Sequence, residues 1–108
     1  MTSYIESNKD EQEYIAVLNG SKCRTYLGFK KELVAAFSLP EEASDNINEI
    51  SGYIFSKWLG FKKIKIVINN TGSLKKEEKQ FNEIMSLLNK WKNFWESTPP
   101  NKLSIEIS

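Results

Sequence analysis

The sequence contains no histidine, and this absence removes the side chain most often used as a general base and as a metal ligand. Its one cysteine, Cys23, cannot form an internal disulfide, and without histidine it cannot form a thiol-protease pair. We expect an inert, partly buried thiol in a reducing compartment. A zinc site would need several cysteines or histidines that the chain lacks. The sequence therefore predicts a protein without catalytic residues, bound metal or cofactor.

Glycine and long apolar runs are also scarce. The five glycines, at positions 20, 28, 52, 60 and 72, form neither a dinucleotide-binding nor a phosphate-binding loop. Adjacent acids could in principle support acid–base or Mg²⁺ chemistry, but such pairs usually belong to a solvated face. No segment approaches the roughly 18 apolar residues of a membrane span, and residues 1–13 lack the apolar core of a signal peptide. We expect a cytoplasmic protein that does not contact membranes.

An excess of charge of one sign is missing as well, because 15 basic and 14 acidic residues leave a net charge of +1. No global field would draw the protein onto nucleic acid. Lysines do cluster at positions 57–65 and 75–79, but the second cluster is interleaved with glutamates, and the aromatic residues fall on apolar stripes. We therefore expect no direct binding of nucleic acid.

What the chain does have is the composition of one small globular domain. It has 108 residues, of which 40% are hydrophobic and 12% aromatic, enough for one core and too few for two. Residues 1–12 are mostly polar and predict a flexible N-terminal tail. The domain is expected over residues 13–108.

Three segments predict strands. Tyr14–Leu18 is an apolar run closed by Asn19-Gly20, typical of a strand buried on both faces at the centre of a parallel sheet. The β-branched run 64–68 and the alternating segment 103–107 predict two flanking strands. Helical segments separate the strands, so we expect parallel pairing with right-handed crossovers. The predicted fold class is α/β, a three-stranded parallel sheet covered by about three helices in the order β-α-α-β-α-β.

Two of the helices have clear limits. The first follows Thr25, a plausible N-cap, and ends at Leu39-Pro40. The long third helix begins near Ser73 or Leu74 and ends at the break over 97–101. Both carry apolar stripes at helical spacing, formed by Tyr26, Phe29, Leu33, Ala36 and Phe37 in the first, and by Phe81, Ile84, Met85, Leu88, Trp91 and Trp95 in the third.

The second helix follows an acidic segment. Its cap is expected at Ser44 or Asp45, and Gly60 closes it. Its inward-facing residues would be Ile47, Ile50, Ile54 and Trp58.

The acids of this segment are the most unusual local feature. Glu41, Glu42, Asp45 and Glu49 occur without a lysine or arginine among them. Acids near a helix N-terminus complement the helix dipole, which would explain Asp45 and Glu49. This explanation does not require Glu41 and Glu42. The excess predicts a local negative potential.

The outward face of the second helix would present Asn48, Glu49 and Gly52, with Ser51 and Phe55 beside them. A glycine inside a helix costs roughly 0.5–1 kcal/mol relative to alanine. Gly52 therefore indicates either close approach by a partner or a tolerated neutral substitution.

These residues occur in a pattern that resembles the barstar family of ribonuclease inhibitors. The resemblance rests on Val17-Leu-Asn-Gly20, the helix Phe29 to Phe37, Leu39-Pro40, Asn46-Ile-Asn-Glu-Ile50 and Ile66-Val-Ile-Asn-Asn70. It covers roughly Tyr14 to Ser108. In that family, the loop and second helix carry the inhibitory surface.

By position, the resemblance matches Asn46 to the family's motif asparagine but also shows departures. Glu42 stands where the family has an aromatic residue, and Ser44 stands where it has a glycine. Asn48 and Gly52 stand at the positions of its two key aspartates, of which the second contributes dominantly to binding within the family. The chain is therefore not expected to inhibit the same ribonuclease.

The resemblance implies an immunity protein that neutralises a cognate protein toxin, with a nuclease as the favoured kind, in a one-to-one complex. Its acids would replace substrate phosphates in a basic active site and speed the encounter. The alternative is a protein-binding adaptor that keeps the fold without inhibiting anything. The predicted partner-binding residues are Glu41, Glu42, Ser44, Asp45, Asn48, Glu49, Ser51, Gly52 and Phe55.

Overall fold

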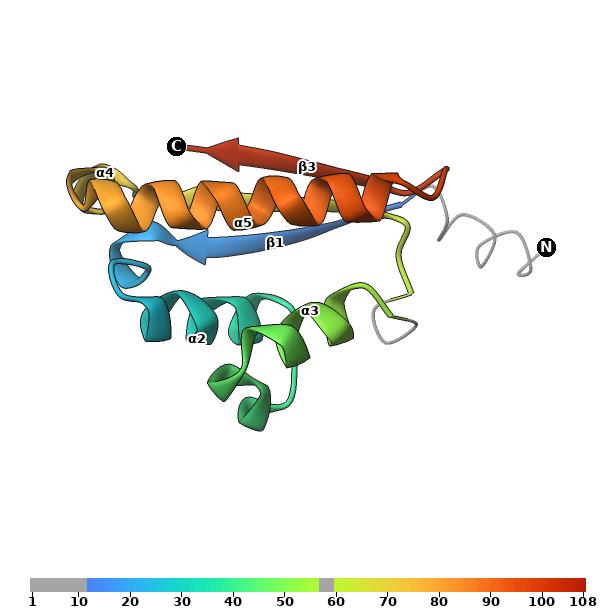
Figure 1. Ribbon diagram of the computed structural model, residues 1–108, viewed down its shortest axis with the longest axis horizontal. Helices are drawn as coiled ribbons and strands as arrows, with labels where there is room; N and C mark the ends of the chain where they lie inside the picture. Colours follow the sequence, from blue (N-terminus) through green and yellow to red (C-terminus); the bar gives the residue numbers. More distant parts are fainter. Residues whose placement is uncertain (1–11, 57–59) are drawn as a thin grey trace.

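The computed structural model describes residues 12–56 and 60–108. Apart from Gln12, which is exposed, the predicted tail lies outside the described residues, as do Lys57 and Trp58. Among the described residues, the elements follow the predicted order β-α-α-β-α-β, with short helices added (Figure 1). They are β1 (Glu13–Asn19), η2 (Gly20–Lys22), α2 (Tyr26–Ala36), η3 (Glu41–Asp45), α3 (Ile47–Ile54), β2 (Lys63–Asn69), α4 (Gly72–Lys76), α5 (Glu78–Glu96) and β3 (Lys102–Ile107).

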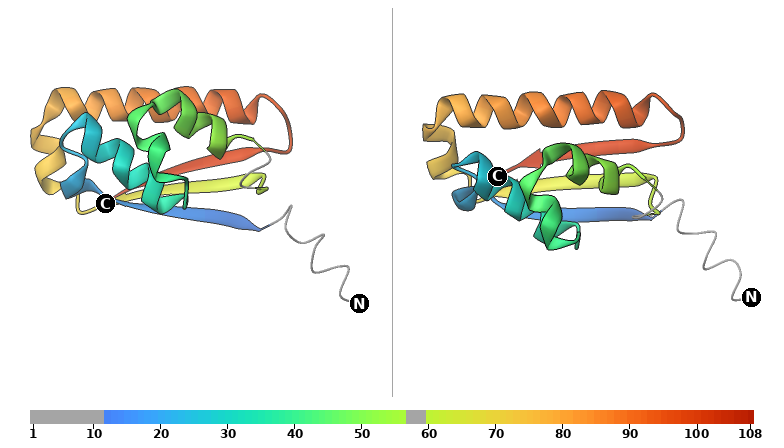
Figure 2. Two further views of the ribbon diagram at one scale, coloured as in Figure 1. Left: turned by 90° about the horizontal axis from the view of Figure 1, so that it is seen from below. Right: turned by 60° about the horizontal axis from the view of Figure 1, so that its bottom comes forward.

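The sheet is three-stranded and parallel, as predicted, but the predicted central strand is wrong. The strand order is β1-β2-β3, so β2 is central and β1 lies at an edge. The prediction assumed that β1 is buried on both faces, whereas the helices cover only one face of the sheet (Figure 2). Ala16 and Leu18 point to that face and are fully buried, whereas Ile15 and Val17 are 55% and 52% exposed on the other. An all-apolar strand is therefore buried on one face only.

The outer face of the sheet is more polar on β2 and β3. Lys63 and Lys65 are half-buried there, and the Lys65 Nζ lies 3.1 Å from a carboxylate oxygen of Glu106. Their aliphatic stems cover part of the sheet while the charged ends reach solvent. On the inner face the three isoleucines of β2, at positions 64, 66 and 68, are fully buried.

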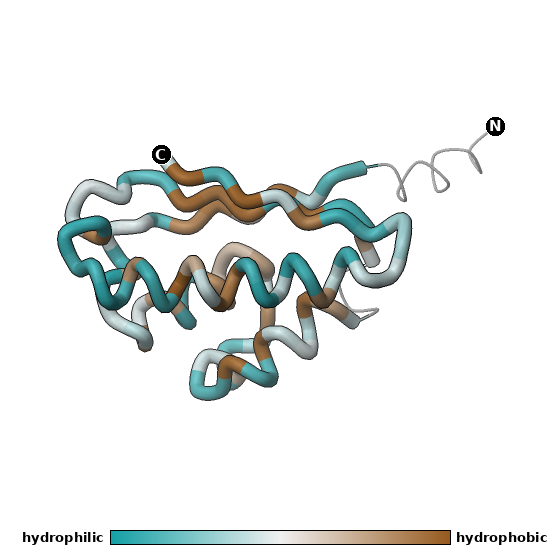
Figure 3. Tube along the Cα trace, turned by 45° about the horizontal axis from the view of Figure 1, so that its top comes forward, coloured by the Kyte–Doolittle hydropathy of each residue, from teal (hydrophilic) through white to brown (hydrophobic). Residues whose placement is uncertain are grey.

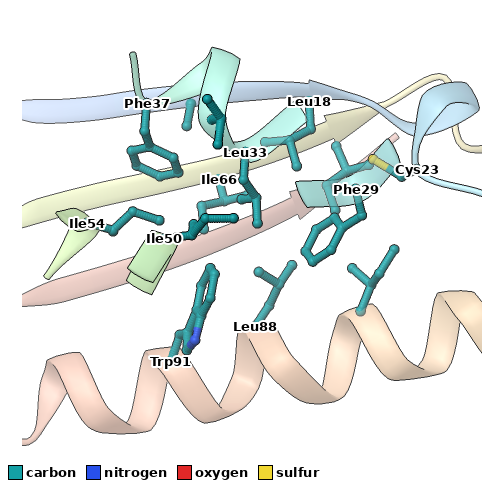
Figure 4. Packing of buried hydrophobic residues seen from close by; sticks show 14 of the residues in the cluster. Leu18, Cys23, Phe29, Leu33, Phe37, Ile50, Ile54, Ile66, Leu88 and Trp91 are labelled. Carbon is teal, nitrogen blue, oxygen red and sulfur yellow. The ribbon is translucent and has the colours of Figure 1, made fainter. Parts of the chain in front are cut away.

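The core fills the space between this inner face and the helices. Hydrophobic residues follow the strands and recur along α5 (Figure 3). Ile50 and Ile54 of α3 lie between Ile66 of the sheet and Trp91 of α5 (Figure 4), and both isoleucines are fully buried. This packing holds α3 against the inner face of the sheet, next to α5 (Figure 2).

Several helix boundaries differ from the predictions, and α2 ends at Ala36 instead of at Leu39-Pro40. The long third helix is broken at Glu77, whose ψ of 72° lies outside the helical region and separates α4 from α5. The second helix ends at Ile54 with Phe55 as its C-cap, one and a half turns before Gly60. Gly60 instead occupies a left-handed conformation with φ of 76° in the connection to β2.

A tight turn after α2 directs the chain into η3. Ser38 has a φ of 53°, and the Leu39 N–H donates to the Val34 carbonyl over 2.9 Å. The Ser38 N–H donates to the Ala35 carbonyl, which completes a Schellman motif with serine at the position where glycine is usual. Pro40 follows and prevents continuation of the helix.

Candidate functional site

The acidic segment forms η3, a 3₁₀-helix that lies on the side of the molecule away from β3 (Figure 1). Ala43 N–H donates to the Pro40 carbonyl over 3.0 Å and fixes the first turn. The N-cap of α3 is Asn46, whose side-chain oxygen accepts from the Asn48 N–H over 2.8 Å. The predicted cap at Ser44 or Asp45 is therefore wrong, because both residues belong to η3.

All four acids of the segment are exposed. None of them forms an ion pair within residues 12–56 and 60–108. Glu42 and Glu49 come together at one open depression of about 680 Å³. We name it the η3–α3 hollow, and it is lined by Pro40, Glu42, Ala43, Glu49, Gly52, Tyr53 and Ser56. Among the described residues, its lining contains two carboxylates and no basic side chain.

A second depression, of about 380 Å³, lies on the other side of α3, where this helix runs next to α5 (Figure 2). We name it the α3–α5 groove, and it is lined by Ile47, Asn48, Ser51, Gly52, Phe55, Leu87, Lys90, Trp91 and Phe94. The structure thus brings four predicted site residues together here, those at positions 48, 51, 52 and 55. The Ser51 hydroxyl donates to the Asn48 carbonyl over 3.1 Å.

The contribution of α5 to this groove is missing from the prediction. Leu87, Lys90 and Phe94 lie about one turn apart on one side of the helix, beside the buried Trp91. One signal exists in the sequence: Phe94 falls outside the apolar stripe of its helix, and the structure leaves it 63% exposed. Nothing in the spacing of α5 indicates that this side meets α3.

Three other predicted residues have different positions. Glu41 and Asp45 are exposed on η3 but line neither depression. The Asp45 carbonyl accepts from the Lys30 ammonium over 3.4 Å, which ties η3 to α2. Ser44 is only 9% exposed, because it lies next to the buried Ala43 on the inner side of the turn. Its side chain therefore contributes little to the exposed surface of the turn.

Gly52 lies where the two depressions meet, since it lines both. A Cβ placed on this residue would have no heavy atom within 4 Å. Its φ is not in the left-handed region, so neither the backbone nor internal packing requires glycine. The missing side chain leaves a low point in the surface of α3.

Cys23 does not belong to this surface. The thiol is fully buried and lies 3.4 Å from the Asn19 carbonyl oxygen. Burial, with a smaller contribution from the carboxylate of Glu32, raises the pKa of Cys23 to about 12. Such a thiol is unreactive at neutral pH.

Neither a metal site nor a membrane span is found in the part of the chain that the structure describes. Its cysteine and acidic residues form no group of three or more that could hold a metal ion. None of its helices combines the length and apolar character needed to cross a membrane.

The fold is a two-layer α/β domain, with helices on one face of a parallel sheet of order 1-2-3, and it exposes an acidic turn and helix. The family model described as barstar (barnase inhibitor) matches residues 13–105. The chain belongs to the barstar family. No curated protein and no solved structure matches it.

Proposed function

We propose that this protein binds a cognate protein toxin, a nuclease, and neutralises it as a one-to-one inhibitor in the cytoplasm. The family supports inhibition of a ribonuclease in general. The observation that carries the proposal is that Glu42 and Glu49 both line the η3–α3 hollow, where the described part of the chain contributes no basic residue.

The mechanism would be occupation of a basic active site. Nucleases bind phosphates through basic groups, and carboxylates can occupy the same positions. Exposed acids on one turn and one helix also create a local field that attracts a basic surface and increases the association rate. Because Glu49 lies in the first turn of α3, the helix backbone holds it in place. Inhibition by this route requires no catalytic group in the inhibitor.

The test uses the nuclease that co-purifies with this protein from the cells that produce it. Glu42→Lys combined with Glu49→Lys should weaken inhibition by roughly tenfold or more, because it places like charges opposite a basic site. The matched control is Glu78→Lys combined with Glu83→Lys, which changes the net charge equally on exposed positions of α5. Equal inhibition by the two double variants would show that the hollow is not the inhibitory surface.

A second candidate function is a protein-binding adaptor without inhibitory activity. It is favoured by Asn48 and Gly52, which stand where the resemblance places the family's two key acids. An adaptor would form the complex and leave nuclease turnover unchanged at saturation. Titration of activity against complex formation separates the two candidates.

A further inference from the structure

The α3–α5 groove has the features of a binding site for an apolar side chain. Phe55 lies at its base, with its ring centroid 5.6 Å from that of Trp91 and 5.8 Å from that of Phe94. Phe94 is 63% exposed, the largest exposed fraction among the described large hydrophobic residues. Aromatic rings of this kind provide large contact areas at the centre of protein interfaces. A volume of about 380 Å³ is near the low end for ligand pockets, which suits one or two side chains.

The charge of the groove is opposite to that of the η3–α3 hollow. Lys90 is the only charged residue among the described residues that line the groove, and it is exposed. It forms no ion pair with any residue in the described ranges. The hollow on the other side of Gly52 contains Glu42 and Glu49. A partner that covers both depressions must therefore present basic groups to the η3–α3 hollow and groups that are not basic to the α3–α5 groove.

We infer that the α3–α5 groove receives an apolar side chain of the protein partner, with a carboxylate beside it that pairs with Lys90. The identity of the partner rests on the proposed function, whereas the chemistry rests on the groove itself. A protein partner is the occupant because the groove continues into the η3–α3 hollow through Gly52, so one surface can fill both. An arginine-rich or lysine-rich segment does not fit, since Lys90 repels it and the described residues of the lining include no acid.

A pair of small probes tests this chemistry without any toxin. 3-Phenylpropionate and 3-phenylpropylamine share a ring and a three-carbon chain and differ in the sign of their charge. Each is titrated into the ¹⁵N-labelled full chain while amide chemical shifts are recorded. We expect 3-phenylpropionate to shift Ser51, Gly52, Lys90 and Phe94, and to bind about twofold to fivefold more tightly than the amine, as an exposed ion pair provides.

Two exposed-site variants locate the effect. Lys90→Glu should reverse the preference between the two probes, and Phe94→Ser should remove binding of both. Lys79→Glu is the matched control, because it makes the same charge change on α5 about three turns away from the groove. It should leave the preference for 3-phenylpropionate unchanged.

Several results would overturn the inference. The two probes could bind with equal affinity, or the amide chemical shifts could change only at residues away from the groove. The third such result is no change in any amide chemical shift at tens of millimolar probe. Amide shifts at the groove that change on dilution without probe would show that a second copy of this chain is the occupant. The Glu42 and Glu49 variants test inhibition independently, so either idea can fail without the other.

Discussion

Two helical glycines should respond oppositely to substitution by alanine. Gly52 is exposed on α3, and an added Cβ would have no heavy atom within 4 Å. Gly28 lies in the first turn of α2, where an added Cβ would be 2.1 Å from the Lys22 carbonyl oxygen and 3.1 Å from the Thr25 hydroxyl. A backbone carbonyl cannot move aside as a flexible side chain can.

The magnitudes follow from these surroundings. Gly52→Ala should raise the free energy of unfolding by about 0.5–1 kcal/mol, because alanine restricts the unfolded chain and meets no steric cost here. For a domain near this size, that corresponds to a rise in Tm of roughly 2–8 °C. Gly28→Ala should gain at most the same stabilisation from the higher helix propensity of alanine. It should lose about 1–3 kcal/mol to overpacking, which leaves a net destabilisation.

Urea unfolding followed by tryptophan fluorescence measures both changes, with midpoint and slope fitted separately. A Gly52→Ala variant that is less stable than the parent would contradict the reasoning, because it would mean that the fold itself requires glycine there. Binding then separates structure from function. If a partner covers both depressions, the added methyl should weaken the complex while the free protein becomes more stable. A gain in stability with unchanged affinity would exclude Gly52 from the interface.

Three further predictions concern residues outside the proposed surface. Ser38→Gly should raise the free energy of unfolding by about 1 kcal/mol, because glycine adopts the left-handed conformation at φ of 53° without the penalty that serine incurs; urea unfolding measures it. The free energy of unfolding should fall as pH rises above 9.0 toward 12, since the folded protein holds the Cys23 proton more tightly; Cys23→Ala should flatten this limb of the pH profile. The pKa of Glu96 lies below its usual 4.5 because its carboxylate accepts from the Leu103 N–H and pairs with Lys92. The stability that this provides is present above pH 4.5 and is lost on acidification below it, so Glu96→Gln should reduce the acid slope in pH-dependent unfolding.

The sequence order of the elements and the parallel direction of the strands could be predicted, because a helical segment follows each of the first two strands and returns the chain to the same end of the sheet. Which strand is central could not. Ile15 and Val17 give β1 the apolar run of a fully buried strand, yet both side chains are about half exposed. Hydrophobicity along one strand cannot reveal that helices cover a single face of the sheet, because that depends on where several helices pack.

The candidate site shows the same division between local and long-range information. Charge and spacing predicted that Glu42 and Glu49 lie on an exposed segment and helix, because these elements depend on nearby residues such as Pro40, even though the cap was predicted at the wrong residue. Lys90 and Phe94 are about 40 residues further along the chain, and the periodicity of α5 shows which side is apolar without showing which helix it meets. Ser44 shows a related limit, since this polar residue of the acidic segment is buried and its burial depends on how η3 packs.

The carboxylates and the aromatic rings lie in different depressions on the two sides of Gly52, so they can contribute differently to affinity and to specificity. Exposed carboxylates act over a distance of about one Debye length and mainly increase the rate of encounter with a basic surface. A buried aromatic contact acts only after docking and therefore mainly slows dissociation. With the carboxylates in the η3–α3 hollow and the rings in the α3–α5 groove, the two effects depend on different residues. Many basic nucleases could then be attracted to η3, while only one that also carries an apolar side chain next to an acid would remain bound.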